Sequence, residues 1–330
     1  MKRFVYFDSG TTNSRAYLIE DGTLADEVRG SVGTITNVMN GSNDVLPQEL
    51  FKLYEVLLHR NELTDADVHG IYMSGMATSK NGVKEIGYLR LPLSPESYAV
   101  SASYAEVPAF GREVGFLTGI VYRPDEPGCL DNIELFHNAR GEEIELFGIM
   151  EKKPELFSGK NCAVIMPGTH THILFTKDRT ITSMCSSIGG ELFQAAREHT
   201  ILKASVPVIP EGLDEEGKRA LIKGYHAVQE LGFNRALYMV RTFDLFSEEN
   251  DNVRGCFMEG VVNADILQGI VNYRKEHALD QVIIAGQEIY AEIFGTMLSE
   301  AFPELPFFAV YPGGESFALS GFMNLVPHLK

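Results

Sequence analysis

The stretch that decides the fold is Phe4-Val5-Tyr6-Phe7-Asp8-Ser9-Gly10-Thr11-Thr12-Asn13-Ser14-Arg15-Ala16-Tyr17-Leu18. Its apolar residues predict two buried strands, one ending at Phe7 and one running from Arg15 to Ile19, joined by a tight turn of small polar residues. Glycine lets a ligand approach the main chain closely, and the residues after it offer consecutive N–H groups with hydroxyl and amide donors. Such a turn suits a polyanion such as a triphosphate. We therefore expect phosphate binding at Gly10, Thr11, Thr12 and Asn13.

Asp8 stands at the end of the first predicted strand, beside this turn. Its hard carboxylate oxygens suit magnesium, either directly or through a bound water. The same pattern is also typical of an ordinary hairpin in which Asp and Gly only form the turn. Because other stretches of the chain favour the first interpretation, we expect Asp8 to act in catalysis, next to Mg²⁺.

The overall composition limits the possible partners. The chain has 330 residues, enough for two domains, and is 45% hydrophobic and 22% charged, as is typical of a soluble globular protein. A formal net charge of −17 argues against nucleic acid or an anionic membrane as the main partner. The four cysteines form no C-x-x-C pair, and the apolar run after Met1 is too short for a signal-peptide core. We expect a cytoplasmic protein with reduced thiols.

The second half of the chain repeats the opening pattern. A strand predicted over Cys162–Met166 leads into Pro167-Gly168-Thr169-His170, and another strand follows at Ile173–Thr176. This order of strand, Gly-Thr loop, strand, turn and strand indicates an internal duplication. The break in pattern near Lys152–Gly159 predicts two domains, 1–155 and 156–330. We expect phosphate binding also at Gly168, Thr169 and His170.

Two later strands, Gln281–Ala285 and Phe307–Tyr311, each lead into glycine and then a predicted helix. This arrangement is typical of an α/β layer with ligand sites at the carboxyl ends of its strands. Neither a Walker A motif nor a G-x-G-x-x-G after the first strand is present, so a P-loop or dinucleotide fold has little support. We expect the adenosine of a nucleotide to lie near Gly190, Gly286 and Gln287.

Five blocks of the sequence resemble the 2-dehydro-3-deoxygalactonokinases, a family of the actin, hexokinase and Hsp70 superfamily. They occur in the family's order: the opening motif, Ser74-Gly75-Met76-Ala77-Thr78-Ser79, Arg140-Gly141-Glu142-Glu143, Pro167-Gly168-Thr169-His170, and Gly190-Glu191-Leu192 with His199.

The resemblance implies a duplicated, ribonuclease-H-like α/β fold of the actin-like ATPase type, with two lobes, mixed sheets and an interlobe cleft. Residues 1–155 then carry the first phosphate loop and the sugar-acid side. Residues 156–330 carry the second phosphate loop and the adenosine side. It also implies an ATP- and Mg²⁺-dependent kinase in galactonate degradation. Such an enzyme phosphorylates a hydroxyl of a 2-keto-3-deoxy sugar acid, above all 2-dehydro-3-deoxygalactonate.

The chain departs from this family in having no tryptophan. The family usually has Trp at the position of Ser9 and near Val83, and a Lys-Trp pair where this chain has His172-Ile173. Two alternatives therefore stay open: a kinase for another sugar or aldonic acid, and a non-catalytic regulator that binds nucleotide or sugar. The retained Asp8, both Gly-Thr loops and Glu142 argue against the regulator.

On the acceptor side, a sugar hydroxyl needs a proton acceptor within hydrogen-bond reach. Glu142 and Glu143 are the candidates, and we favour Glu142, although the pair is equally typical of an acidic first helical turn. The residues that we expect to bind the sugar acid are Arg15, Ser79, Lys80 and Arg140. A surface salt bridge is the simpler role for Arg15, and Lys80 has the alternative of lying in solvent. His170 and His172 lack a third ligand nearby, which argues against zinc. A homo-oligomer is possible.

Overall fold

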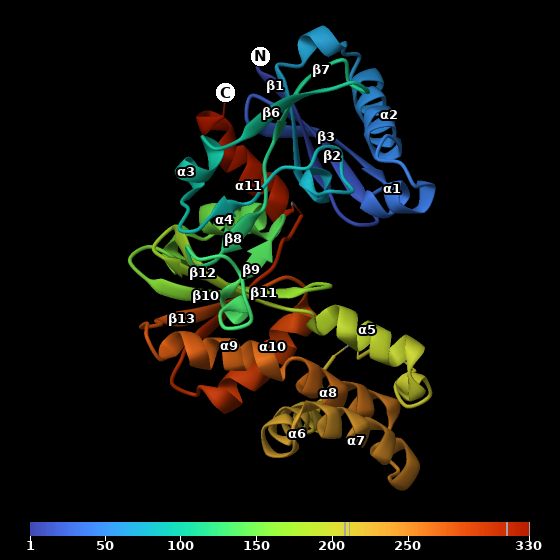
Figure 1. The fold of residues 1–330 in the computed structure, drawn as a ribbon, viewed down its shortest axis with the longest axis vertical. Helices are drawn as coiled ribbons and strands as arrows, with labels where there is room; N and C mark the ends of the chain where they lie inside the picture. Colours follow the sequence, from blue (N-terminus) through green and yellow to red (C-terminus); the bar gives the residue numbers. More distant parts are fainter. Residues whose placement is uncertain (208, 211, 315, 330) are drawn as a thin grey trace. The chain divides into compact units, whose positions relative to one another are not determined.

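The computed structural model describes residues 1–330 except positions 208, 211, 315 and 330 (Figure 1). The chain divides into two compact units. Unit 1 comprises Met1–Leu156, Arg179–Thr182 and Gly313–Lys330, and unit 2 comprises Phe157–Asp178 and Ser183–Pro312. The main break thus falls one residue after the expected 155/156 boundary, and the C-terminal segment belongs with the N-terminal half.

Unit 1 is built on a mixed sheet of six strands in the order β3-β2-β1-β4-β7-β6. The central strand β1 pairs antiparallel with β2 and parallel with β4, and β4 in turn pairs parallel with β7. The strands are β1 (Arg3–Ser9), β2 (Ser14–Glu20), β3 (Thr23–Gly30), β4 (Gly70–Gly75), β6 (Ser103–Val107) and β7 (Arg112–Phe116).

The two faces of this sheet are covered by different helices because successive side chains of a strand point to opposite faces. On one face, Val5 and Phe7 share a core with Leu46 and Leu50 of α2 (Val45–Arg60), which follows α1 (Thr34–Asn40). On the other face, Tyr6 stacks on Phe322 of α11 (Phe317–Leu325) with ring centroids 4.3 Å apart. α11 packs closely against α4 (Glu142–Lys152).

The remaining elements of unit 1 are small. A three-stranded sheet has the order β5 (Leu89–Arg90), β8 (Ile120–Tyr122) and β9 (His137–Ala139), and α3 (Pro95–Ala99) precedes β6. Between these sheets the chain leaves β7 at Phe116 and enters β8 of the three-stranded sheet at Ile120.

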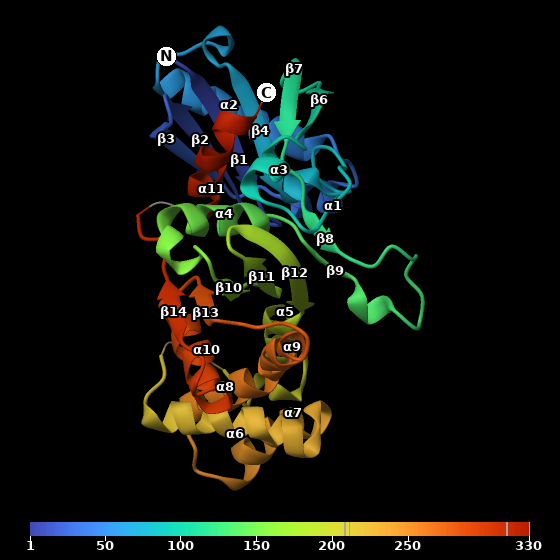
Figure 2. The same cartoon turned by 90° about the vertical axis from the view of Figure 1, so that its left-hand side faces the viewer.

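Unit 2 is built on a five-stranded sheet in the order β12-β11-β10-β13-β14, of which the first residues of β12 are grouped with unit 1. Its core contains Ile165 and Ile284 from the sheet together with Ile270 and Phe294 from helices, and a second core lies among α5 to α8. Figures 1 and 2 show α6, α7 and α8 side by side. The elements are β10 (Asn161–Met166), β11 (Thr171–Lys177), β12 (Thr180–Ser187), α5 (Gly189–His199), α6 (Glu215–Leu231), α7 (Phe233–Phe246), α8 (Asp251–Val262), α9 (Ala264–Arg274), β13 (Gln281–Ala285), α10 (Glu288–Ala301) and β14 (Phe307–Val310).

The two sheets share one topology, so the predicted duplication is confirmed. β10 pairs antiparallel with β11 and parallel with β13, as β1 does with β2 and β4. The helix after each three-stranded meander also begins against the first loop: Ile35 N–H donates to the Thr11 carbonyl at 2.9 Å, and Glu191 N–H donates to the Thr169 carbonyl at 2.7 Å. The expected fold class, a duplicated α/β fold with mixed sheets, is confirmed at this level.

A close backbone approach fixes the entry to both helices. A Cβ on Gly33 would lie 2.4 Å from the Thr11 carbonyl oxygen, and one on Gly190 would lie 2.1 Å from the Gly168 carbonyl oxygen. Both distances are too short for any side chain, so only glycine allows the helix start to contact the loop.

In the part of the chain that the structure describes, no helix is both long enough and apolar enough to pass through a membrane.

The substitution Gly33→Ala tests this packing. We expect it to lower the free energy of unfolding by about 1–3 kcal/mol, because loop and helix must separate to admit the methyl group. Gly87→Ala is the control, since a Cβ there meets nothing within 4 Å. Urea denaturation of the two variants measures the difference, and equal stabilities would contradict the proposed constraint.

Candidate active site

The first Gly-Thr loop of unit 1 turns its carbonyls toward α1. The Gly10 carbonyl accepts from Thr34 N–H at 3.3 Å, and Gly10 N–H donates to the Asn13 carbonyl at 2.8 Å. Thr11, Thr12 and Asn13 are exposed. The carbonyls of Gly10 and Thr11 thus accept from the start of α1, and the exposed residues of the loop lie where a ligand can reach them. The sequence predicts such an exposed turn for phosphate binding.

Asp8 lies at the carboxyl end of β1, next to this loop. It is half-buried, stands opposite Arg15 in the β1–β2 register, and is level with Ser74 of β4. Burial raises the pKa of Asp8 above its ordinary value, the charge of Glu142 raises it further, and Arg15 opposes both. Arg15 is therefore the cation that balances Asp8 electrostatically.

The start of α4 meets the ends of β1 and β4. A Cβ on Gly75 would lie 2.5 Å from the Ser9 carbonyl oxygen, and one on Gly141 would lie 3.7 Å from the Gly75 Cα. Gly75 and Gly141 have positive φ angles of 65° and 115°. These backbone contacts bring the Arg140–Glu143 block beside Asp8, although more than a hundred residues separate them in the sequence.

A group of carboxylates, Asp8, Glu142 and Glu145, occupies this corner of unit 1, and we call it the acidic cluster. The Glu142 carboxylate accepts a hydrogen bond from Arg140 N–H at 2.8 Å. Glu145 lies three residues further along α4; burial raises its pKa to about 8, with further contributions from Asp8 and Glu142, and Arg15 opposes the shift. Glu145 was not among the residues expected from the sequence, although its i+3 spacing from Glu142 places both on one helix face.

The other residues expected at the sugar acid have structural partners. Arg140 donates to the Thr78 carbonyl at 2.7 Å and to the Ile86 carbonyl at 3.4 Å, and its guanidinium lies 4.3 Å from the ring centre of Tyr88. These contacts hold Arg140 against the segment that follows β4.

Ser79 and Lys80 belong to that same segment. The Ser79 hydroxyl donates to the Met76 carbonyl at 2.8 Å, and Lys80 is exposed, with its carbonyl accepting from the Asn43 side chain at 3.0 Å. Of the four residues expected to bind the sugar acid, Arg15 is the one whose charge acts on Asp8. A sugar-binding role for all four stays a prediction.

The second Gly-Thr loop, in unit 2, is similarly open: Gly168, Thr169 and His170 are exposed. The His170 Nε2 lies 3.0 Å from the Glu191 carboxylate, whereas His172 is buried with its Nδ1 2.9 Å from the Ser186 hydroxyl. Over the described residues, no three His, Cys, Asp or Glu side chains are grouped so as to hold a metal.

The residues expected near adenosine lie around this second loop. Gly190 touches the Gly168 carbonyl, as described above. Gly286, with φ of 134°, lies where a Cβ would be 3.8 Å from Pro167, and the exposed Gln287 occupies the position just before α10. One edge of the unit 2 sheet thus brings together Pro167, Gly168, Gly190, Gly286 and Gln287.

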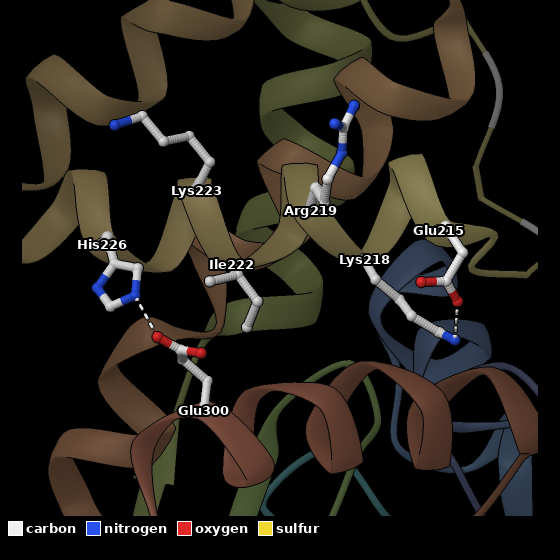
Figure 3. A pocket seen from close by; sticks show the side chains of 7 residues that line it. All are labelled: Glu215, Lys218, Arg219, Ile222, Lys223, His226 and Glu300. Carbon is white, nitrogen blue, oxygen red and sulfur yellow. Dashed lines mark hydrogen bonds and ion pairs between the residues drawn. The ribbon is translucent and has the colours of Figure 1, made fainter.

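Two hollows lie away from these loops. One of about 420 Å³ lies between α6 and α10, where Lys218 pairs with Glu215 and His226 pairs with Glu300, each at 2.8 Å (Figure 3). Another of about 580 Å³ in unit 1 is lined by residues of α2, of the segment after β4 and of the β6 end. Neither contains a residue expected from the sequence to bind ligand.

The profile of the 2-keto-3-deoxy-galactonokinase family matches residues 8–306. The chain belongs to this family. A curated relative from Rhizobium meliloti (strain 1021), named "Probable 2-dehydro-3-deoxygalactonokinase DgoK1", is 29% identical over 202 residues. That alignment covers 60% of this chain and 58% of the relative, so it spans less than two thirds of the relative's length.

Solved structures support the fold. A protein from Sinorhizobium meliloti assigned as a 2-dehydro-3-deoxygalactonokinase has a TM-score of 0.76 at 21% identity, over 98% of this chain and 97% of its own. A propionate kinase from Francisella tularensis has a TM-score of 0.51 at 9% identity, over 98% and 99% of the two chains. At these identities the similarity establishes the fold alone.

The pKa of Glu145 yields a prediction about stability. Because folding raises this pKa from 4.5 to about 8, the wild-type protein loses stability as the pH rises through that interval. Glu145→Gln lacks this loss, so we expect it to be more stable than wild type at pH 9 by at least about 1 kcal/mol, with a smaller difference at pH 5. Urea unfolding at both pH values measures this, with the exposed Glu155→Gln as control; a difference independent of pH would contradict the assignment.

Proposed function

We propose that this protein is an ATP-dependent kinase that transfers the γ-phosphoryl group to a hydroxyl of 2-dehydro-3-deoxygalactonate, a 2-keto-3-deoxy sugar acid. The observation that carries the proposal is the family match over residues 8–306. The duplicated Gly-Thr loops and the acidic cluster supply groups that such a reaction needs. Phosphoryl transfer depends mainly on positioning and on neutralising charge.

The phosphates of ATP are bound at both loops, Gly10–Asn13 and Gly168–His170. Exposed residues in each loop and helix starts packed behind them support this role. Backbone N–H groups are well suited to this chain, because its net charge of −17 repels an anionic substrate from most of its surface. Adenosine then lies near Gly190, Gly286 and Gln287.

Magnesium fits the residues present. It typically keeps several waters and uses one or two carboxylates together with substrate phosphates, so it does not need a group of three protein ligands. Asp8 is a half-buried carboxylate directly beside the first loop. In our proposal Asp8 holds the metal, directly or through water, and the bound metal offsets phosphate charge.

The proton of the acceptor hydroxyl goes to Glu142. The hydroxyl oxygen forms a bond to the γ-phosphorus, the bond from that phosphorus to the ADP oxygen breaks, and the proton moves to the Glu142 carboxylate. The hydrogen bond from Arg140 N–H orients this carboxylate before substrate binds. Arg15, Ser79, Lys80 and Arg140 are the residues that we assign to the sugar-acid side.

A kinase for a different sugar or aldonic acid is the second candidate. It is favoured by the absence of tryptophan from this chain, since the family usually places Trp residues at positions that here include Ser9. The two candidates share the chemistry and differ in the acceptor.

Asp8→Asn tests the metal and phosphate chemistry. We expect the variant to fold normally and to lose at least a hundredfold in turnover, about 3 kcal/mol of transition-state stabilisation, because the amide carries no charge for the metal. Steady-state kinetics and circular dichroism provide the measurements. Near-normal turnover would remove Asp8 from the mechanism.

The acceptor is tested with a panel of sugar acids and an ADP-release assay. We expect 2-dehydro-3-deoxygalactonate to give the highest kcat/KM, ahead of 2-dehydro-3-deoxygluconate, galactonate and neutral hexoses. Preference for another panel member would establish the second candidate. ATP binding without ADP release for any acceptor would contradict both and favour a regulator.

A further inference from the structure

Glu143, next to the proposed base, is enclosed in the interior of unit 1. Its side chain is fully buried, with 0% of its surface exposed, whereas Glu142 is half-buried. One carboxyl oxygen, Oε2, accepts from Gly141 N–H at 2.9 Å. The other, Oε1, lies 3.3 Å from the hydroxyl oxygen of Tyr98 on α3.

The number of hydrogen-bond protons available around Tyr98 decides whether Glu143 is protonated. The Tyr98 hydroxyl oxygen also lies 2.7 Å from the Thr118 carbonyl oxygen, the shorter of its two contacts. A carbonyl oxygen can only accept, so Tyr98 donates its single hydroxyl proton to the Thr118 carbonyl. The contact between Tyr98 and Glu143 then needs a proton from Glu143 itself.

Further hydrogen bonds connect this network and the start of α4 with the segment after β4. The Thr118 hydroxyl donates to the Gly87 carbonyl at 2.8 Å, and Arg140 donates to the carbonyls of Thr78 and Ile86. Arg140 and Gly141, the two residues whose N–H groups contact Glu142 and Glu143, are thereby fixed on both sides.

We propose that Glu143 is a positioning residue, held as a neutral carboxylic acid that links Gly141 to Tyr98 and so fixes the start of α4 and the carboxylate of Glu142. This inference rests on the proposed function for its catalytic consequence, but the state of Glu143 is testable without it. It also separates the roles of the two adjacent glutamates, one as base and one as support.

The surroundings of Glu143 agree with a neutral side chain. Burial raises its pKa to about 8, and the charge of Glu142 adds to the shift; hydrogen bonds from the backbone N–H groups of Glu143 and Gly141 oppose it. The other polar groups that face it are Tyr6 on β1 and, near Tyr98, Arg140. α11, which packs against α4, contributes no titratable side chain over Phe317–Leu325.

The kinetic experiment compares Glu143→Gln with Glu143→Ala and Glu142→Gln, using ATP, magnesium and the best acceptor of the panel. A glutamine amide accepts from Gly141 N–H and donates to Tyr98, as the neutral acid does. We expect Glu143→Gln to keep kcat within about threefold of wild type at pH 7. Glu143→Ala loses at least tenfold in kcat with little change in KM for ATP, and Glu142→Gln loses at least as much.

The pH profile adds a readout that a merely structural role does not move. We expect wild-type kcat to decline above pH 8 as Glu143 ionises, and Glu143→Gln to show a smaller decline. A loss of turnover in Glu143→Gln equal to that of Glu142→Gln would overturn the proposal, because Glu143 would then act in its ionised form.

Urea denaturation tests the neutral state without any phosphoryl transfer. Because folding raises the pKa of Glu143 from 4.5 to about 8, wild-type stability falls as the pH rises through that interval, and Glu143→Gln lacks this fall. The urea midpoint of Glu143→Gln minus that of wild type is therefore expected to be larger at pH 8.5 than at pH 5. A constant difference would overturn the neutral acid. If no acceptor is phosphorylated but the midpoints diverge, the proposed function fails and the state of Glu143 stands.

Discussion

The contact of a helix start with the carbonyls of a Gly-Thr loop is the constraint on which both halves of this protein depend. In unit 1 Gly33 lies against Thr11, and in unit 2 Gly190 lies against Gly168, in each case too close for a Cβ. Just after these glycines, Ile35 N–H in unit 1 and Glu191 N–H in unit 2 donate to a carbonyl of the loop. Because these carbonyls accept from the helix start, each loop is held with its exposed side facing away from that helix start, where we propose that it binds phosphate.

The electrostatics of unit 1 follow from a second constraint, the convergence of backbones at Ser9, Gly75 and Gly141. It places several carboxyl groups together where burial raises the pKa values of Asp8, Glu143 and Glu145. Burying carboxylates near one another costs stability. Such costs are typical of functional sites, where pKa values are adjusted to the chemistry.

Local sequence patterns predict much of this architecture. The opening hairpin, β13 over Gln281–Ala285 and the duplicated loops all follow from short runs of apolar residues ended by glycine and small polar residues. What the patterns do not contain is the long-range packing: Tyr6 stacks on Phe322, more than three hundred residues away, and this contact joins the C-terminal helix to unit 1. The short elements β5, β9 and α3 also have too few residues to show a period.

The candidate site shows the same limit. Asp8 lies near the end of β1 and each Gly-Thr loop follows a strand directly, so the sequence pattern is enough to locate all three. Glu142 and Glu143 are neighbours in the sequence, which gives no sign that one is half-buried and the other fully buried in contact with Tyr98. The partners of Arg140 likewise come from Thr78 and Ile86, segments that the sequence does not place beside it.

We propose that both loops bind the phosphates of one nucleotide. Hydrogen–deuterium exchange of the full chain, with and without a non-hydrolysable ATP analogue and magnesium, tests it most directly. The account predicts slower exchange in peptides covering residues 10–13 and in peptides covering residues 168–171, with the same dependence on analogue concentration. Protection of one loop with no change in the other would contradict it.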